Sequence, residues 1–175
     1  MLPGDDGHPK TGPRFWMVCG LATHRRVMSL TNEAEANLVL LLFNNTNWAN
    51  IGDATGLRGS TTAGVFYTSL HTADPGETGD QTTSEANYTG YSRVSVNRAS
   101  GAGGFTCATD TASNTSAVPF GACTAGSSTC THFGIGTGSS GAGHLVASGA
   151  LTASLAVTAG ITPSAAAGAL TIVAA

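Results

Sequence analysis

The sequence predicts a mainly β protein, an antiparallel β-sandwich or jelly-roll-like domain with one N-terminal helix. Short runs rich in β-branched and aromatic residues recur between Gly, Ser, Asp and Pro, and no helical pattern separates them. Only one segment, near residue 32, has the composition and start signals of a helix. Hydrophobic residues make up 41% of the 175 residues, which is enough for one modest core.

Residues 1–27 differ in composition from the rest of the chain and are predicted to be an N-terminal extension. They carry four of the chain's seven Lys and Arg residues, and Gly and Pro interrupt them repeatedly. Residues 28–175 are predicted to form a single β-rich domain. No repeat of fixed period is visible, so a solenoid or propeller is not expected.

The helix is predicted over residues 32–43. Asn32 can cap its first turn, with Glu35 three residues later, and good helix formers follow. The helix is apolar on nearly every side, because LVLLLF occupies residues 38–43. Such a helix cannot lie on a free surface, so we expect it to be sandwiched in the core or docked on a neighbour.

The strands are expected after residue 64. Turn residues are frequent between 48 and 64, which predicts a loop leading into the first strand. Period-two alternation is clear at residues 151–157 and indicates that one face of the sheet is buried. The predicted strands are 65–71, 91–97, 104–109, 116–120, 129–135, 144–148, 151–157 and 170–175.

Charge and hydropathy argue against binding to nucleic acid and against membrane insertion. The net charge is −3, and no cluster of Lys or Arg forms the positive patch that phosphate binding needs. The longest apolar run, residues 38–43, is far shorter than the roughly 18–20 residues of a membrane-spanning helix. The four cysteines are expected to be reduced and mostly buried, and Cys123–Cys130 is the one local disulfide that the spacing allows.

Ser69, His71 and Asp74 fall within six positions, yet we predict that they do not form a catalytic triad. No nucleophile elbow or oxyanion hole is evident around Ser69. The chain is therefore expected not to be an enzyme, with no catalytic residue and no cofactor.

The acidic stretch over residues 74–85 is expected to have a structural role. Its spacing does not fit an EF-hand, so no metal site is predicted. Arg93 and Arg98 are the only cations on the strand that follows. We predict a structural ion pair between Arg93 and either Glu85 or Asp74.

The low charge content favours assembly in many copies. Only 10% of the residues are charged, and protein interfaces are depleted in charged side chains. Apolar and aromatic side chains of the helix and of residues 88–91 are the candidates for contact with other subunits. These candidate interface residues are Leu38, Leu41, Leu42, Phe43, Tyr88 and Tyr91.

Five blocks of sequence occur in an informative order. They are SLHTADPG at 69–76, SEANYTGYSRVSV at 84–96, FGAC at 120–123, THFGIGT at 131–137 and GAGHLVASGALTASLAV at 141–157. Together they resemble a family of small tailed-bacteriophage virion proteins, whose members often carry labels such as tail fibre protein. The resemblance covers residues 28–173 and implies a structural protein with no catalytic residues. Phe105 stands where the family suggests a Trp, and residues 1–27 have no counterpart.

The function expected first is that of a capsid decoration or cement protein on the capsid surface. It would bind the major capsid protein and copies of itself, as a homo-oligomer such as a trimer. The alternative is a tail or tail-fibre component that binds a host-surface saccharide through Trp48, Asn87, Tyr88 and Tyr91. A cell-envelope hydrolase is disfavoured, because no pair of catalytic carboxylates and no metal motif is evident.

Overall fold

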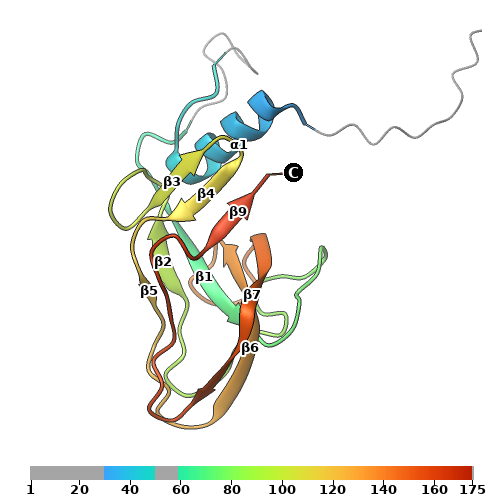
Figure 1. Ribbon diagram of the computed structural model, residues 1–175, viewed down its shortest axis with the longest axis vertical. Helices are drawn as coiled ribbons and strands as arrows, with labels where there is room; N and C mark the ends of the chain where they lie inside the picture. Colours follow the sequence, from blue (N-terminus) through green and yellow to red (C-terminus); the bar gives the residue numbers. More distant parts are fainter. Residues whose placement is uncertain (1–29, 50–58, 175) are drawn as a thin grey trace, which may run out of the picture.

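The computed structural model describes residues 30–49 and 59–174, which form one helix and nine strands (Figure 1). The extension predicted for residues 1–27 lies outside the described residues. In chain order the elements are α1 (Asn32–Asn44), β1 (Val65–His71), β2 (Val94–Asn97), β3 (Phe105–Ala108), β4 (Thr111–Asn114), β5 (Val118–Pro119), β6 (Ser127–Gly136), β7 (Leu145–Thr158), β8 (Ser164–Ala165) and β9 (Thr171–Val173). The predicted mainly β class with one N-terminal helix is confirmed.

The strands form three sheets, and every strand pair is antiparallel. The largest sheet has the order β2-β1-β6-β7, the second has the order β3-β4-β9, and β5 pairs with β8. Helix α1 lies at one end of the molecule against β3 and β4 (Figure 1). This arrangement agrees with the expected β-sandwich.

The N-cap of α1 is Thr31 rather than the predicted Asn32. The Thr31 hydroxyl oxygen accepts a hydrogen bond from the Ala34 N–H at 3.3 Å, which satisfies one of the free donors of the first turn. Glu33 and Glu35 still lie in that turn, beside the positive end of the helix dipole. The acidic start was therefore predicted correctly, and the capping residue was misplaced by one position.

Arg98 closes the other end of α1. Its Nε donates to the Leu42 carbonyl at 2.6 Å, its Nη2 donates to the Leu41 carbonyl at 2.9 Å, and its guanidinium lies 5.7 Å from the centre of the Phe66 ring. A cation at the last carbonyls of a helix satisfies acceptors that have no partner within the helix. Arg98 thus ties the helix to the residues that follow β2.

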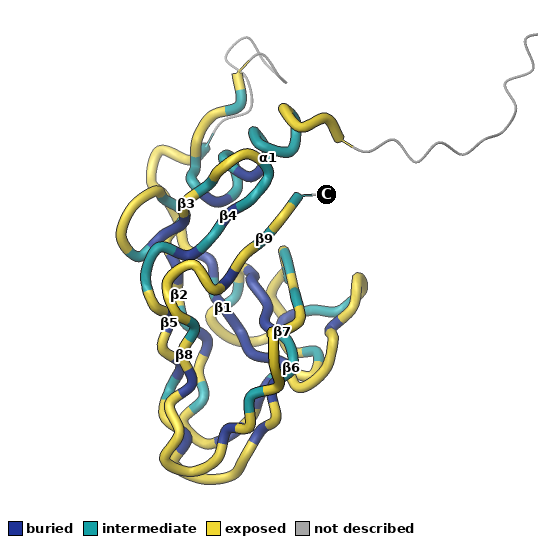
Figure 2. Tube along the Cα trace, viewed as in Figure 1, coloured by how far each residue is buried: buried dark blue, intermediate teal, exposed yellow. Residues whose placement is uncertain are grey.

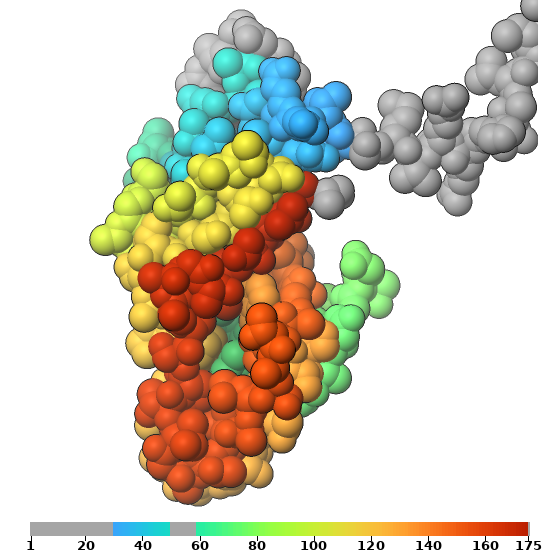
Figure 3. Space-filling model, viewed as in Figure 1, coloured from blue at the N-terminus to red at the C-terminus, as the bar shows by residue number. Residues whose placement is uncertain are grey.

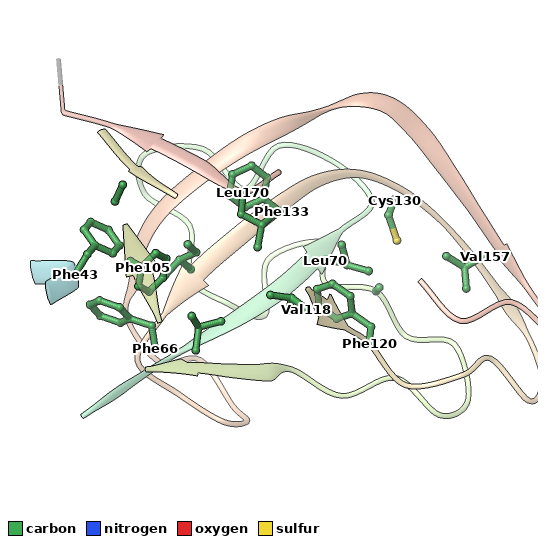
Figure 4. Packing of buried hydrophobic residues seen from close by; sticks show 14 of the residues in the cluster. Phe43, Phe66, Leu70, Phe105, Val118, Phe120, Cys130, Phe133, Val157 and Leu170 are labelled. Carbon is green, nitrogen blue, oxygen red and sulfur yellow. The ribbon is translucent and has the colours of Figure 1, made fainter. Parts of the chain in front are cut away.

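The core runs as one cluster along the molecule, from the helix to the far ends of β6 and β7 (Figure 4). At the helix end, Phe105 is fully buried and meets Phe43 edge to face, with the ring centres 5.0 Å apart. Phe66 also packs on Phe43, with a ring separation of 5.5 Å. At the opposite end, Cys130 and Val157 are fully buried.

Two predicted strands, 144–148 and 151–157, form a single 14-residue strand, β7. Cys130 on β6 pairs with Leu155, whereas His132 pairs with Ala150, so four residues of β7 stand opposite Thr131 alone. Residues 151–154 therefore bulge away from β6. Within the bulge the alternation of burial is interrupted, because Ala153 is exposed while Leu151 and Leu155 are half-buried.

Two short strands, β4 and β8, were not predicted. Their sequences, TASN and SA, have no run of β-branched or aromatic residues. Cys107, Cys123 and Cys130 are free thiols, so the Cys123–Cys130 disulfide is absent, and Cys19 lies outside the described residues. No helix of the described part of the chain is long and apolar enough to cross a membrane.

Candidate interaction surface

Arg93 forms a bidentate ion pair with Glu85. Arg93 Nε lies 2.6 Å from Glu85 Oε1 and Arg93 Nη2 lies 2.7 Å from Glu85 Oε2. The side chains are 2% and 18% exposed, so the pair is largely shielded from water. The hydrogen bonds with Glu85 raise the pKa of Arg93. Of the two carboxylates predicted to bind Arg93, Asp74 does not do so, because its Oδ1 instead accepts the Gly76 N–H of its own turn at 2.9 Å.

The ion pair also holds the loop between β6 and β7. Arg93 Nη1 donates to the Gly138 carbonyl at 2.9 Å, and Arg93 Nη2 donates to the Gly141 carbonyl at 2.8 Å. The buried Gln81 side chain holds the same loop, because its Oε1 accepts a hydrogen bond from the Gly138 N–H at 2.7 Å. The glycine-rich segment that sequence inspection assigned to a hairpin loop is thus fixed by two buried polar side chains.

Ser69 and His71 touch in the core, although they do not form a triad with Asp74. Ser69 Oγ lies 2.8 Å from His71 Nε2, and His71 Nδ1 lies 2.8 Å from the Thr83 carbonyl oxygen. Since a carbonyl can only accept, Nδ1 carries the proton and the neutral ring accepts the Ser69 hydroxyl at Nε2. Both side chains are fully buried, so a substrate has no access to the hydroxyl.

The buried imidazole predicts a dependence of stability on pH. Burial is the largest effect and lowers the pKa of His71 below its usual value of 6.5, despite the Thr83 carbonyl and Glu85, which raise it. The unfolded chain therefore binds more protons than the folded chain below about pH 6.5, and the free energy of unfolding should fall as the pH drops from 6.5 towards 5. Urea denaturation at several pH values measures this slope.

Two variants separate His71 from the other titrating groups. His71→Gln should flatten the slope between pH 5 and 6.5, because the side chain no longer takes up a proton on unfolding. Ser69→Ala retains the histidine and should retain the slope. An unchanged slope in His71→Gln would show that other groups cause it.

The structure moves two of the candidate interface residues into the core. Phe43 is 2% exposed and Tyr88 is 3% exposed, because Phe43 packs on Phe105 and Tyr88 packs edge to face on Tyr91. Apolar character in the sequence did not distinguish an interior side chain from an interface side chain. Leu38, Leu41, Leu42 and Tyr91 are half-buried.

The aromatic residues proposed for saccharide binding do not form a platform. The Tyr91 hydroxyl donates to Glu85 Oε1 at 2.9 Å, and the Tyr88 hydroxyl donates to the Gly121 carbonyl at 2.9 Å. The Tyr91 ring also stacks on Phe120. Trp48 is half-buried and Asn87 is exposed. Burial makes the assignment to a saccharide site wrong for Tyr88, which is 3% exposed. For the half-buried Tyr91, as for Trp48 and Asn87, saccharide binding stays a prediction.

The surface that the sequence analysis missed is uncharged. No Asp, Glu, Lys or Arg occurs between residues 111 and 175, so the strands from β4 to β9 carry no charged side chain. Several residues of β7 and β9 are exposed, and Figure 2 shows them in yellow. The sequence does contain a signal for this surface, because Asp110 is its last charged residue and 65 uncharged positions follow.

A groove lies between β7 and β9, and we call it the β7–β9 groove. Residues 145–148 of β7 and 171–173 of β9 line its two sides, and it holds about 280 Å³. Phe133 of β6 also lines it, and Glu77 is its one charged lining residue. Figure 3 shows the hollow between the red segment, which includes β9, and the orange segment, which includes β7.

A second hollow continues along the bulged half of β7. It holds about 390 Å³, and residues 150–153 and Leu155 of β7 line it together with β8. Buried side chains of Leu70, Phe120 and Leu170 also contribute to its lining. The described residues contain no group of His, Cys, Asp and Glu side chains that could hold a metal ion. Two features with room for a partner are therefore these hollows beside β7, of which the first has Glu77 as its one charged lining residue and the second has none.

Comparison with protein-family models gives a match over residues 29–173, to a family described as Podophage GP4 fiber I protein gp80. The match spans every helix and strand of the structure. A search of curated proteins found no match.

Proposed function

We propose a fibre role from one premise: the chain belongs to the Podophage GP4 fiber I protein gp80 family. Membership makes it a structural protein of a phage virion. The finer proposal is that many copies of the chain build or decorate a fibre of the virion. The family match carries this proposal, because its description names a fibre protein and it covers the whole described fold.

The structure supports a structural role rather than a catalytic one. Ser69 and His71, a Ser–His pair that the described residues bring into contact, are both fully buried. An enzyme needs its nucleophile or base within reach of the substrate, and this pair has no such access. We therefore propose that the chain acts through binding surfaces alone.

The capsid decoration role expected from the sequence becomes the second candidate. It rests on the charge-poor composition and on the expected contact with the major capsid protein, and the family description does not mention a capsid. A fibre subunit and a cement protein both need uncharged surfaces for repeated contacts. The family description therefore decides the order of the two candidates.

Fractionation of the virion tests the proposal. Purified particles are separated into DNA-filled heads and detached tails or fibres, and each fraction is analysed by mass spectrometry. Because no Lys or Arg follows Arg98, trypsin leaves residues 99–175 as one peptide, and chymotrypsin is the better protease. We expect the chain in the tail or fibre fraction. Its presence only on heads would overturn the fibre role and favour the cement role.

Particles without the protein give an independent measurement. A fibre subunit predicts normal DNA retention on heating and slower adsorption to host cells. A cement protein predicts early loss of DNA and normal adsorption, because ligands that bind the assembled shell stabilise it.

A further inference from the structure

Sheet edges attract other strands, and two of the edges in this fold are already engaged. An edge strand presents unpaired N–H and C=O groups that can bond to another strand. At β2, the Asn97 N–H donates to the Gly103 carbonyl at 2.9 Å, and at β3 the Phe105 N–H donates to the Ala99 carbonyl at 2.9 Å. Both strands are only four residues long, and the turn between them occupies part of their outer edges.

The edge of β7 differs from these two. β7 is the longest strand, it ends the four-stranded sheet, and within the described residues its outer side pairs with no strand. Natural edge strands are protected by charged residues, prolines, bulges or a covering element. The bulge at residues 151–154 protects the second half of β7. Residues 145–150 contain no charge and no proline, and their one irregularity is a single extra residue, Val146, between the pairs Ile135–Ala147 and Gly136–Leu145.

A second free edge lies across the same groove. β9 ends the three-stranded sheet, and within the described part of the chain its outer side also pairs with no strand. Val173 of β9 is 54% exposed and Val146 of β7 is 39% exposed, and both line the β7–β9 groove. They are two of the five large hydrophobic side chains that are exposed in the described residues.

The charges indicate what can occupy this groove. The described residues hold two arginines and seven carboxylates. Arg93 is bound to Glu85 and Arg98 is bound to the carbonyls of α1, so the remaining Asp, Glu, Lys and Arg side chains of the described residues are all negative. They are Glu33, Glu35, Asp74, Glu77, Asp80 and Asp110. The other five cations of the sequence lie outside the described residues and are Lys10, Arg14, Arg25, Arg26 and Arg58.

A contact between identical copies brings like surfaces together, so a surface without charged side chains avoids like-charge repulsion at that contact. The strands from β4 to β9 supply such a surface, and the edges of β7 and β9 supply the backbone groups to bond across it. We propose that the β7–β9 groove binds a second copy of this chain, whose free strand edge pairs with residues 145–150. Val146 and Val173 become buried in that contact.

This inference deepens the proposed fibre role, since a fibre subunit must bind copies of itself. It does not depend on where the protein lies in the virion. A chain found only on heads but forming this contact would overturn the fibre role alone.

Lysine substitutions at the two valines test the contact. The full-length chain is measured by size-exclusion chromatography with light scattering, up to its highest soluble concentration. We expect an oligomer, and we expect Val146→Lys and Val173→Lys each to raise its dissociation constant by roughly tenfold or more. Val65→Lys is the matched control, because Val65 is 37% exposed and lies outside the groove, and it should leave the oligomer unchanged.

Cysteine variants keep the test valid if a lysine variant fails to fold. Val146→Cys and Val173→Cys are mixed under mild oxidation, and disulfide-linked dimers are counted on a non-reducing gel. A cross-link above the level of Val65→Cys supports the proposal. A monomeric wild type, an oligomer that both lysine variants leave intact, or cross-linking no greater than the control would overturn it.

Discussion

Replacing Arg93 with Met should lower the free energy of unfolding by about 3 to 5 kcal/mol, the usual cost of leaving one partner of a buried ion pair alone. Arg93 is 2% exposed at its side chain and makes hydrogen bonds to Glu85, Gly138 and Gly141. Its loss leaves a shielded carboxylate without its cation and removes two of the hydrogen bonds that hold the loop between β6 and β7. Urea denaturation followed by circular dichroism measures the change.

Variants of Glu85, the partner of Arg93, and of Asp74, a nearby carboxylate, serve as comparisons for the loss of stability in Arg93→Met. Glu85→Gln together with Arg93→Met should cost less than the sum of the single changes, because the double variant leaves no uncompensated charge. Asp74→Ala should change stability by less than about 0.5 kcal/mol, since its carboxylate is exposed and binds only its own turn. Equal effects of Arg93→Met and Asp74→Ala would contradict the ion pair described above.

Phe105→Ala should also lower the free energy of unfolding by about 3 to 5 kcal/mol, because it opens a cavity in a closed part of the core. Phe105 is fully buried and connects the sheet of β3 and β4 to Phe43 of α1. The helix should therefore lose part of its packing together with the sheet. Chemical denaturation gives the stability, and far-ultraviolet circular dichroism gives the helix content.

Substitutions of different size at the same place sharpen this result. Phe105→Leu should cost less than Phe105→Ala, because it leaves a smaller cavity. Phe105→Trp, which restores the residue that the family leads one to expect, should cost about 1 to 3 kcal/mol if the surroundings do not widen. Thr106→Ala, at an exposed neighbouring position, is the control and should have little effect. A small loss in Phe105→Ala would show that the helix packs independently of this ring.

Local sequence signals predicted the elements that depend on local properties. The strand at residues 65–71 was predicted with its observed bounds, because VFYTSLH combines aromatic and β-branched residues and Gly64 precedes it. The helix was predicted to within one residue at each end, because its acidic start and leucine-rich body favour a helix in any context.

Elements that depend on distant partners were missed. β4 has the sequence TASN, and its strand conformation depends on pairing with β3 and β9. Its last residue, Asn114, is buried, and its side-chain oxygen accepts the Leu170 N–H from 56 residues away. No local pattern contains that information.

The candidate sites show the same division. Arg93 was identified because cations are rare in this sequence, and the choice between Glu85 and Asp74 required the three-dimensional arrangement. Phe43 and Tyr88 were assigned to an interface because an apolar residue looks the same in sequence whether a neighbour or its own chain covers it. The edge of β7 was missed because an unpaired edge is a property of the sheet order.

The sheet order also has a consequence for how the chain acquires its structure. β1 lies between β2 and β6, and the residues of β6 are synthesised more than 50 positions after those of β1. Leu170 belongs to the same core, so the core can close only after residue 170 has been synthesised. Proteins with so many distant contacts fold slowly, and their strands stay exposed for longer. During that interval the uncharged segment of β7 is open to premature association, and we expect the yield of soluble protein to rise when expression is slowed at low temperature.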